Sequence, residues 1–315
     1  MMPSYYDPVP ENVMPRFAGL ATFMNMAPLQ AGETPDIVVV GAPFDGGTTM
    51  RPGARMGPRA LREASHGLYP YHRVHRHKLT DRVSVADGGD LFVVATDIVQ
   101  TLEHMTRQLR ILGERSRILM MGGDHSVTLA PLRAARERYG QPLALIHLDA
   151  HSDLWDTMWG GPYNHATVFR RAVEEGLIDP AHSIQVGMRG SLEEAAEDQF
   201  GDELGIVQIS TDQWLDQGNE RVQAAIAQRV GQWPAYVSVD IDVVDPAFAC
   251  GTGTPEAGGP SSYTVLSLLR LLPSLVVGAD VVELAPDLDV TRNSALFAAS
   301  VAYELLFLLA HGAGY

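Results

Sequence analysis

The sequence predicts an α/β fold: a single three-layer α/β/α domain on a mostly parallel sheet of about eight strands. Short runs rich in Val and Ile, without strict polar alternation, are typical of strands that are covered on both faces. Longer segments with helical periodicity separate these runs. Regular alternation of strand and helix favours a parallel sheet, because each crossover places a helix on one of its faces.

The predicted elements follow one another in order along the chain. Strands are expected at 37–41, 83–86, 118–121, 144–148, 183–187, 206–209, 235–239 and 276–282. Helices are expected at 57–66, 96–113, 126–139, 165–175, 191–199, 219–230, 263–273 and 293–310. The most apolar stretch, 296–310, contains Ser300 and Glu304 and is shorter than the ~20 residues that span a bilayer. We therefore expect a core helix there and no membrane partner.

The segment before the first strand differs in composition from the rest. Residues 1–35 are rich in Pro and Met and show little periodicity. They are expected to form an extended N-terminal arm used in subunit packing, and residues 36–315 are expected to form one domain. With 46% hydrophobic residues, the chain can bury a large core.

Composition also narrows the class of protein. With a net charge of −15 and a pI near 5.1, the chain lacks the excess of basic residues that is typical of a nucleic-acid-binding protein. Cys250 is the only cysteine, so neither an internal disulfide nor a cysteine-based zinc cluster is available. No basic residue precedes Arg16 and no continuous apolar run lies near it, so we expect no signal peptide and a cytoplasmic protein.

Acidic and histidine residues follow four of the predicted strands. Gly-Gly-Asp-His-Ser follows 118–121, Asp-Ala-His-Ser-Asp follows 144–148, Asp-Ile-Asp follows 235–239, and Glu283 follows 276–282. Ligands of open parallel sheets bind beyond the carboxyl ends of the strands. Residues two apart in an extended chain point to the same side, so these clusters are expected to converge.

The clusters offer two imidazoles and four carboxylates: His125, His151, Asp149, Asp153, Asp240 and Asp242. Oxygen-rich ligation with some imidazole suits a hard or borderline divalent ion such as Mn²⁺. Six ligands suit two ions roughly 3.5–4 Å apart, bridged by carboxylates, better than one ion with an open position. Turn capping is the alternative for any one cluster, but it does not explain three clusters at strand ends.

The same segments resemble the signature motifs of the ureohydrolase (arginase/agmatinase) family. The three central motifs are Gly-Gly-Asp-His-Ser at 122–126, Asp-Ala-His-Ser-Asp at 149–153 and Ser-Val-Asp-Ile-Asp-Val-Val-Asp-Pro at 238–246. Three further matches are Arg-Pro-Gly-Ala-Arg-Met-Gly-Pro at 51–58, Gly-Thr-Gly-Thr-Pro-Glu at 251–256 and Asp-Val-Val-Glu-Leu-Ala-Pro at 280–286. The resemblance is strongest to the agmatinase and guanidino-acid hydrolase branch. It implies an arginase-like fold and a hydrolase that releases urea and an amine from a small guanidino compound.

Carried over residue by residue, the resemblance implies two Mn²⁺ ions, with Ni²⁺, Co²⁺ or Zn²⁺ as alternatives. One ion is expected on His125, Asp149, Asp153 and Asp242, and the other on Asp149, His151, Asp240 and Asp242. Asp153 is also expected to pass a proton to the leaving amine, His165 to shuttle protons, and Glu283 to pair with the substrate guanidinium. Two cations lower the pKa of bound water, which compensates for the poor electrophilicity of a guanidinium. The family also implies a homo-oligomer, a trimer or hexamer.

Substrate choice depends on residues outside these motifs. The candidates for substrate binding are Trp155, Asp156, Tyr163, Asn164 and Arg189. The loop 154–164 carries Asp156 and no basic residue, which favours a cation such as agmatine, the precursor of putrescine. Arg189 favours a carboxylate-ended compound such as guanidinobutyrate or guanidinopropionate, and guanidine is a further alternative. The family's usual His-Gly-Thr is His165-Ala166-Thr167 here, and the loop lacks the Asn- and Ser-rich pattern of arginases.

Several neighbouring residues are expected to support the site without binding metal. His147 is expected to be a buried core or supporting histidine, and Asp124 and Asp245 to orient ligands or cap turns. His72, His75 and His77 lie among basic residues, which is typical of a solvated loop or, as the alternative, an anion site.

Three other functional classes are weaker alternatives. A deacetylase with one zinc ion would need only an Asp/His/Asp set, so His125, Asp153 and Glu283 would have no purpose. A non-catalytic guanidino-binding protein would not need the complete ligand set. A two-metal phosphatase would need a phosphate-clamping loop, and no such loop is evident in the sequence.

Overall fold

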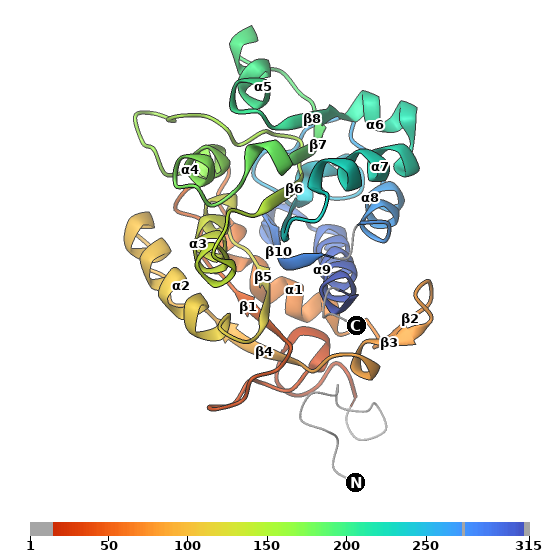
Figure 1. The fold of residues 1–315 in the computed structure, drawn as a ribbon. Coiled ribbons are helices and arrows are strands. Elements are labelled where there is room, and N and C mark those ends of the chain that lie inside the picture. The colour runs from red at the N-terminus through yellow and green to blue at the C-terminus, as the bar shows by residue number, and fades with distance from the viewer. Residues whose placement is uncertain (1–14, 273–274, 312–315) are drawn as a thin grey trace.

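The computed structural model describes residues 15–272 and 275–311, and its centre is a parallel sheet (Figure 1). Eight strands pair in the order β4-β1-β5-β10-β9-β6-β7-β8. Their bounds are β1 (Ile37–Gly41), β4 (Val85–Asp90), β5 (Arg117–Met121), β6 (Ala144–Leu148), β7 (Ile184–Met188), β8 (Val207–Ser210), β9 (Ala235–Asp240) and β10 (Val276–Val282). Every pairing in this sheet is parallel, so the predicted α/β fold is confirmed.

Helices cover both faces of the sheet. They are α1 (Gly57–Ser65), α2 (Ile98–Leu112), α3 (Leu129–Tyr139), α4 (Val168–Glu174), α5 (Phe200–Leu204), α6 (Thr211–Gln217), α7 (Asn219–Val230), α8 (Ser262–Leu269) and α9 (Asn293–His311). The segment expected as a helix at 191–199 is instead a 3₁₀ helix, Ala195–Gln199, that leads into α5. Helix α6 was not predicted, and α8 ends before the expected boundary at 273.

Alternation along the strands divides the core into two halves. In β1, Ile37 and Val39 pack into the half beneath α1, α7, α8 and α9, whereas Val38 and Val40 pack into the half beneath α2, α3 and α4 (Figure 1). Full burial of each such side chain contributes about 1.5–3 kcal/mol. This double coverage explains why the strands are continuously apolar.

The C-terminal helix α9 is the core helix that was expected there. By length and composition it is the one helix of the described residues that could cross a membrane, but 78% of its apolar window is buried inside the protein. It packs along α1, α8 and β10. Its hydrophobicity is therefore accounted for by the core.

Part of the predicted N-terminal arm is packed against the domain. The backbone N–H of Phe23 donates to Asp87 Oδ2 at 2.7 Å, and that of Met24 donates to Ser65 Oγ at 2.8 Å. Both side chains are fully buried. Residues 1–14 of the predicted arm lie outside the described residues, and its role in subunit packing stays a prediction.

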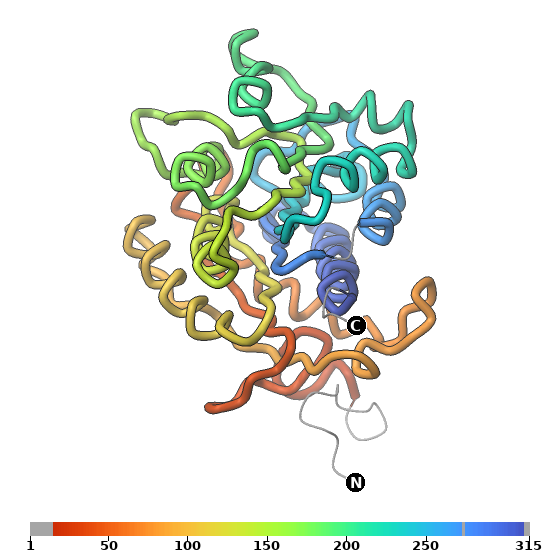
Figure 2. The backbone as a smooth tube through the Cα atoms, viewed as in Figure 1, coloured from red at the N-terminus to blue at the C-terminus, as the bar shows by residue number. Residues whose placement is uncertain are grey.

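A small antiparallel hairpin lies apart from the main sheet. Its strands are β2 (Tyr71–His72) and β3 (His77–Lys78), and it was not predicted from the sequence. The hairpin lies beside the C-terminal end of α9 (Figure 2).

Candidate metal centre

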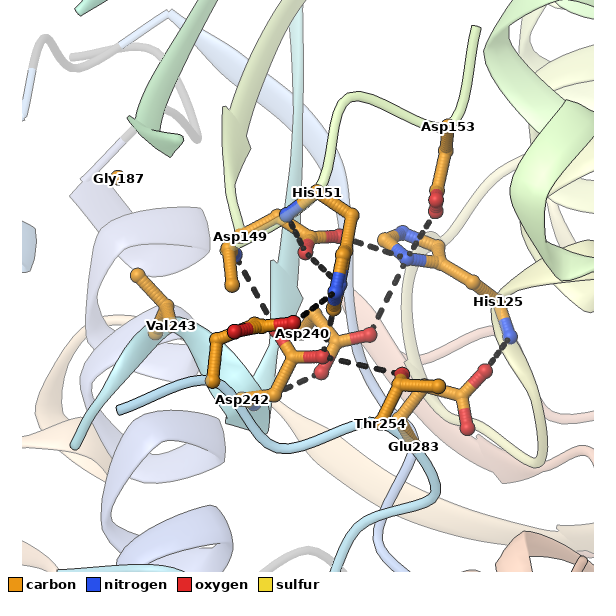
Figure 3. A network of polar contacts seen from close by, with 12 residues as sticks. His125, Asp149, His151, Asp153, Gly187, Asp240, Asp242, Val243, Thr254 and Glu283 are labelled. Atoms are coloured by element: carbon orange, nitrogen blue, oxygen red, sulfur yellow. Dashed lines mark hydrogen bonds and ion pairs between the residues drawn. The ribbon is translucent and has the colours of Figure 1, made fainter. Parts of the chain in front are cut away.

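The candidate site lies where four adjacent central strands end. Strands β5, β10, β9 and β6 are neighbours in the sheet, and their carboxyl ends lead directly into His125, Glu283, Asp240 and Asp149. The side chains of Asp149, His151, Asp240 and Asp242 point toward one another, with His125 and Asp153 beside them (Figure 3). The predicted convergence of the strand-end clusters is therefore found in the structure.

The turn after β5 depends on close backbone approach. A Cβ built on Gly123 would lie 1.7 Å from the carbonyl oxygen of Phe44, so no side chain can be accommodated at this position. Gly123 in turn accepts a hydrogen bond from the N–H of Glu283 at 2.9 Å, and Asp124 donates to Phe44 at 2.8 Å. These contacts join the ends of β5 and β10 and place His125 beside Glu283.

His125 has one ring nitrogen directed at three carboxylates. Its Nδ1 lies 3.2 Å from Asp149 Oδ2, 3.0 Å from Asp153 Oδ2 and 3.4 Å from Asp240 Oδ2. On the other side, Ser238 donates to Asp280 at 2.6 Å, so its oxygen is free to accept from His125 Nε2 at 2.8 Å. That bond leaves Nδ1 as the position for a second ring proton or for a cation, and this nitrogen is buried without a hydrogen-bond partner in the described chain. A lone pair among three carboxylates suits a bound cation.

His151 forms the second half of the cluster. Its Nδ1 lies 3.1 Å from Asp242 Oδ2 and 3.4 Å from Asp149 Oδ1. The two oxygens of Asp149 thus face different imidazoles, as the predicted bridging role requires. The contacts place Asp240 with His125 and Asp242 with His151, and they do not support the expected pairing of Asp242 with His125.

The charges of the cluster are strongly coupled. Burial favours the neutral form of His125, but Asp149, Asp153 and Asp240 outweigh it and raise the pKa of the imidazole well above its usual value. Burial, and then the charge of Asp149, raise the pKa of Asp242 to about 6. Burial, and then Asp242 and Asp149, raise the pKa of Asp240 well above its usual value. Such crowding of acids in a buried place is relieved by divalent cations.

Asp149 is oriented by a chain of polar side chains, beginning with His147. The Gln185 amide donates to Ser152 O at 2.6 Å and to His147 Nδ1 at 2.9 Å. His147 must therefore carry its proton on Nε2, which donates to Asp149 Oδ2 at 2.8 Å. His147 thus acts as an orienting residue, in agreement with the sequence-based expectation.

Glu283 and His165 form a pair beside the candidate metal ligands. Glu283 Oε1 accepts from the His125 N–H at 2.8 Å and lies 2.9 Å from His165 Nδ1. The Thr49 N–H donates to His165 Nε2 at 3.1 Å, so the ring proton is on Nδ1 and points to Glu283. Burial favours the neutral ring, but Glu283 and then Asp153 and Asp124 raise the pKa of His165 to about 9. The Thr49 hydroxyl lies 2.7 Å from the same Nε2 and can accept a second ring proton.

The carboxylates of Asp124 and Asp245 accept hydrogen bonds from backbone N–H groups. Asp124 accepts from the N–H groups of Gly47 at 2.7 Å and Ser126 at 3.0 Å, and burial followed by the charge of Glu283 raises its pKa to about 7. Asp245 accepts from Ala247 at 2.9 Å and Gly258 at 2.7 Å. Both carboxylates cap turns, which matches their expected role.

Most of the candidates for substrate binding contact residues outside the cluster of imidazoles and carboxylates. Asp156 is 68% exposed and pairs with Arg171, whereas Asn164 caps the 3₁₀ helix His165–Thr167 by accepting from Ala166. Trp155 packs edge-on against Phe200, and Tyr163 is partly buried against the core beneath α3 and α4. None of these contacts is with a candidate metal ligand.

Arg189 clamps the loop that carries Asp242. Its Nε donates to Glu256 O, Nη1 donates to the carbonyls of Gly187 and Val243, and Nη2 donates to those of Asp242, Val244 and Glu256. All five guanidinium N–H groups are thereby occupied. These contacts give Arg189 a positioning role and leave no donor for a substrate carboxylate.

Several supporting residues were not identified from the sequence. They include Ser238, Asp280, Gln185, Thr49 and Glu256, whose carboxylate lies 3.9 Å from His151 Nε2. Ser238, Asp280 and Glu256 lie in motifs that the family resemblance had singled out. Amide and hydroxyl side chains such as those of Gln185 and Thr49 are common throughout the chain, so nothing in their local sequence marks them.

Comparison with known proteins places this arrangement in context. The family model described as the Arginase family matches residues 35–308. The chain is 44% identical over 313 residues to a guanidinopropionase from Pseudomonas aeruginosa, which covers 98% of this chain and 97% of the relative. It is 39% identical over 298 residues to an agmatinase from Salmonella paratyphi B, covering 93% of each protein.

The fold is also similar to that of a solved structure. The proclavaminate amidino hydrolase from Streptomyces clavuligerus superposes with a TM-score of 0.90 at 40% identity, covering 95% of this chain and 99% of that chain. The similarity therefore extends over nearly the full length of these relatives.

Proposed function

Because this chain belongs to the arginase family and is a hydrolase acting on the C–N bonds of guanidino compounds, we propose that it cleaves agmatine to urea and putrescine. The observation that carries the proposed reaction is the convergence of two imidazoles and four carboxylates beside Glu283. The carboxylates offer sites for cations, and Glu283 offers a partner for a guanidinium.

The residues present fit two divalent ions, for which we propose Mn²⁺. His125 with Asp149, Asp153 and Asp240 would hold one ion, and His151 with Asp149 and Asp242 would hold the other. When bound, such a pair lowers the pKa of water and so makes hydroxide available at neutral pH.

Glu283 is placed to receive the substrate. Because Oε1 is occupied by the His125 N–H and by His165, Oε2 has no hydrogen bond among the described residues. It can accept from a guanidinium N–H, and the opposite charges strengthen that bond. We assign Glu283 the role of orienting the planar cation over the metal ligands.

Proton transfer to the departing amine is assigned to Asp153 and His165. Asp153 Oδ2 lies 3.0 Å from His125 Nδ1 and would therefore lie beside a bound ion and the hydroxide that the ion supplies. His165 holds a proton on Nδ1 and can hold another at Nε2, where the Thr49 hydroxyl lies 2.7 Å away and can accept it. Cleavage needs a proton on the leaving nitrogen, and these two groups supply it.

A cationic tail is favoured by the charges around the site. Glu256 lies 3.9 Å from His151 and has no side-chain hydrogen bond in the described chain, whereas the guanidinium of Arg189 is fully occupied. A carboxylate without a hydrogen bond and an arginine with all its donors occupied favour a substrate that ends in an ammonium group, as agmatine does.

A guanidino acid is the second candidate. The relative that is 44% identical over nearly the whole chain is a guanidinopropionase. 3-Guanidinopropionate ends in a carboxylate, so its use would require a cationic or N–H partner other than Arg189.

Urea release from Mn²⁺-loaded enzyme tests the proposal. The panel is agmatine, 4-guanidinobutyrate, 3-guanidinopropionate, L-arginine and guanidine. We expect the highest kcat/KM with agmatine. A higher value with 3-guanidinopropionate would replace the substrate while keeping the reaction. No urea from any compound, with two metal ions bound per chain, would contradict the proposed function.

Two further properties stay proposals. A trimeric or hexameric homo-oligomer is implied by the family resemblance, and a cytoplasmic location is expected from the sequence. The molecular mass in solution, measured by light scattering, tests the first.

A further inference from the structure

A buried carboxylate, that of Asp280 on β10, accepts hydrogen bonds from three hydroxyl groups behind the candidate metal centre. Ser238 donates to its Oδ1 at 2.6 Å, whereas Thr128 and Tyr236 each donate to its Oδ2 at 2.8 Å. All four side chains are buried, and none is more than 1% exposed. The hydroxyls come from β9 and from the 3₁₀ helix that follows β5, so the carboxylate joins these two elements to β10.

The two oxygens of this carboxylate have different partners. Because Oδ2 accepts from both Tyr236 and Thr128, the orientation of the carboxyl group is fixed. Because Oδ1 accepts from Ser238, the hydroxyl proton of Ser238 is directed away from His125. The oxygen of Ser238 therefore faces His125 Nε2 as an acceptor, at 2.8 Å, and the first ring proton is held on Nε2. Nδ1 is left to face the carboxylates of the candidate centre.

The other imidazole of the centre lacks such support among the described residues. His151 Nε2 lies 3.9 Å from Glu256 Oε1, which is beyond hydrogen-bond distance. The side chain of His151 is 33% exposed, whereas that of His125 is 1% exposed. A change in the network behind His125 should therefore affect the ion proposed at His125 and spare the ion proposed at His151.

We propose that Asp280 is a positioning residue that reserves Nδ1 of His125 for a metal ion, an inference that rests on the proposed two-metal function. A histidine that binds a metal through one nitrogen gives its other N–H to an acceptor, which fixes the tautomer and the ring orientation. A hydroxyl can donate as well as accept, so Ser238 alone would not decide between the two tautomers. Asp280 decides between them because it takes the hydroxyl proton of Ser238.

Asp280→Asn should reverse this direction with little change in shape. The amide has one oxygen that accepts and one NH₂ group that donates. Since Tyr236 and Thr128 both donate at the Oδ2 position, the amide oxygen belongs there and the NH₂ group faces Ser238. The hydroxyl proton of Ser238 is then free to point to His125 Nε2, and a neutral ring carries its one proton on Nδ1. A proton on Nδ1 competes with the ion for the same lone pair.

Titration of the metal-free, full-length protein with Mn²⁺ tests the proposal, with free Mn²⁺ counted by electron paramagnetic resonance. We expect wild type to bind two ions per chain. In Asp280→Asn one ion should bind as in wild type, and the affinity for the other should fall by about 10- to 100-fold, the usual cost of losing such a supporting contact.

Tyr236→Phe is the matched control. It removes one buried hydroxyl from the same carboxylate and leaves the bonds from Thr128 and Ser238 in place. It should therefore bind both ions as tightly as wild type, although it also loses one hydrogen bond of the core. Weakening of one ion in Asp280→Asn alone separates positioning from a general loss of structure.

Ser238→Ala serves as the test if Asp280→Asn does not fold. It removes the acceptor for His125 Nε2, so it should weaken the same single ion. Two ions bound at wild-type affinity in the folded variant would overturn the proposal, and so would equal weakening in Asp280→Asn and Tyr236→Phe. Fewer than two ions in wild type would instead contradict the two-metal function on which the proposal rests.

Discussion

Two site residues adopt a backbone conformation that L-amino acids rarely take. Asp153 has φ of 53° and Glu283 has φ of 65°. A non-glycine residue in this left-handed region costs about 1–3 kcal/mol and persists where the surroundings enforce it. At Glu283 the enforcing contact is the bond from its N–H to Gly123, which turns the side chain toward His125. The conformation directs a carboxylate back over the strand ends.

Glu283→Gln tests the role of this carboxylate. The amide keeps the shape but loses the charge, so it should weaken the bond to a guanidinium by about 1.5–3 kcal/mol, or roughly 10- to 150-fold in kcat/KM. Both metal ions should remain bound, because Glu283 is not among the proposed ligands. Steady-state kinetics with agmatine and metal analysis measure the two effects. Unchanged KM and kcat would remove Glu283 from the substrate site.

Arg189→Ala distinguishes a positioning residue from a substrate-binding one. Without the guanidinium, the carbonyls of Asp242, Val243 and Val244 lose their donors, and each unsatisfied buried group costs about 1–3 kcal/mol. We expect a lower midpoint of urea unfolding and weaker metal retention. A substrate-binding role would instead raise KM with the metal content and the midpoint unchanged.

The convergence of the candidate metal ligands could be predicted because they are His and Asp residues placed at the ends of apolar runs. His125, Asp149 and Asp240 each lie at or just after the end of a strand, where hydrophobicity is lost. The partition between the two ions could not be predicted, since it depends on whether Asp240 or Asp242 turns toward His125. That choice is made by the short 3₁₀ helix Ile241–Val243, in which Asp240 Oδ1 caps the N–H of Asp242 at 2.8 Å.

At the scale of elements, the predicted bounds are correct for strands that are buried on both faces of the sheet. Strands β1, β6 and β10 match their expected bounds because both faces select Val and Ile. The β2–β3 hairpin lacked this signal, since each strand has two residues and its sequence is basic and histidine-rich. Helix α6 is also short, and its start depends on Ser210 accepting from Gln213.

The turn before α9 provides a pH-dependent prediction. Asp289 accepts from the N–H and hydroxyl groups of Thr291 and Ser294, and although burial alone would raise it, these bonds hold the pKa of the carboxyl well below its usual value. A depressed pKa stabilises the folded state above the unfolded value of about 3.9, and this contribution is lost as pH falls toward the lower folded value.

Asp289→Asn isolates this contribution because the amide does not titrate. We expect the free energy of unfolding of wild type to exceed that of the variant at pH 7 and the gap to narrow below about pH 4. Urea unfolding of both proteins across that range measures the gap. A difference that does not change with pH would contradict a role for the carboxylate charge.

At the scale of the whole molecule, the centre concentrates like charges inside the fold. Four carboxylates are buried together at the carboxyl ends of the central strands: Asp149, Asp153, Asp240 and Asp242. Removal of bound metal by a chelator should therefore lower the thermal midpoint, and added Mn²⁺ should restore it in a concentration-dependent way. Thermal unfolding with and without chelator measures the shift. Asp149→Asn should show little response to Mn²⁺, and an identical midpoint with and without metal in wild type would contradict the prediction.

The order of strands has a consequence for the newly made chain. β10 is the last strand to leave the ribosome, yet it lies between β5 and β9 near the middle of the sheet. Until Val276–Val282 is inserted, the facing edges of β5 and β9 have no partner there, and unpaired strand edges promote association with other chains. Glu283 also arrives with this strand. A translating chain therefore gains a continuous eight-stranded sheet and a complete candidate centre in the same late step, and its strand edges are open to other chains until that step.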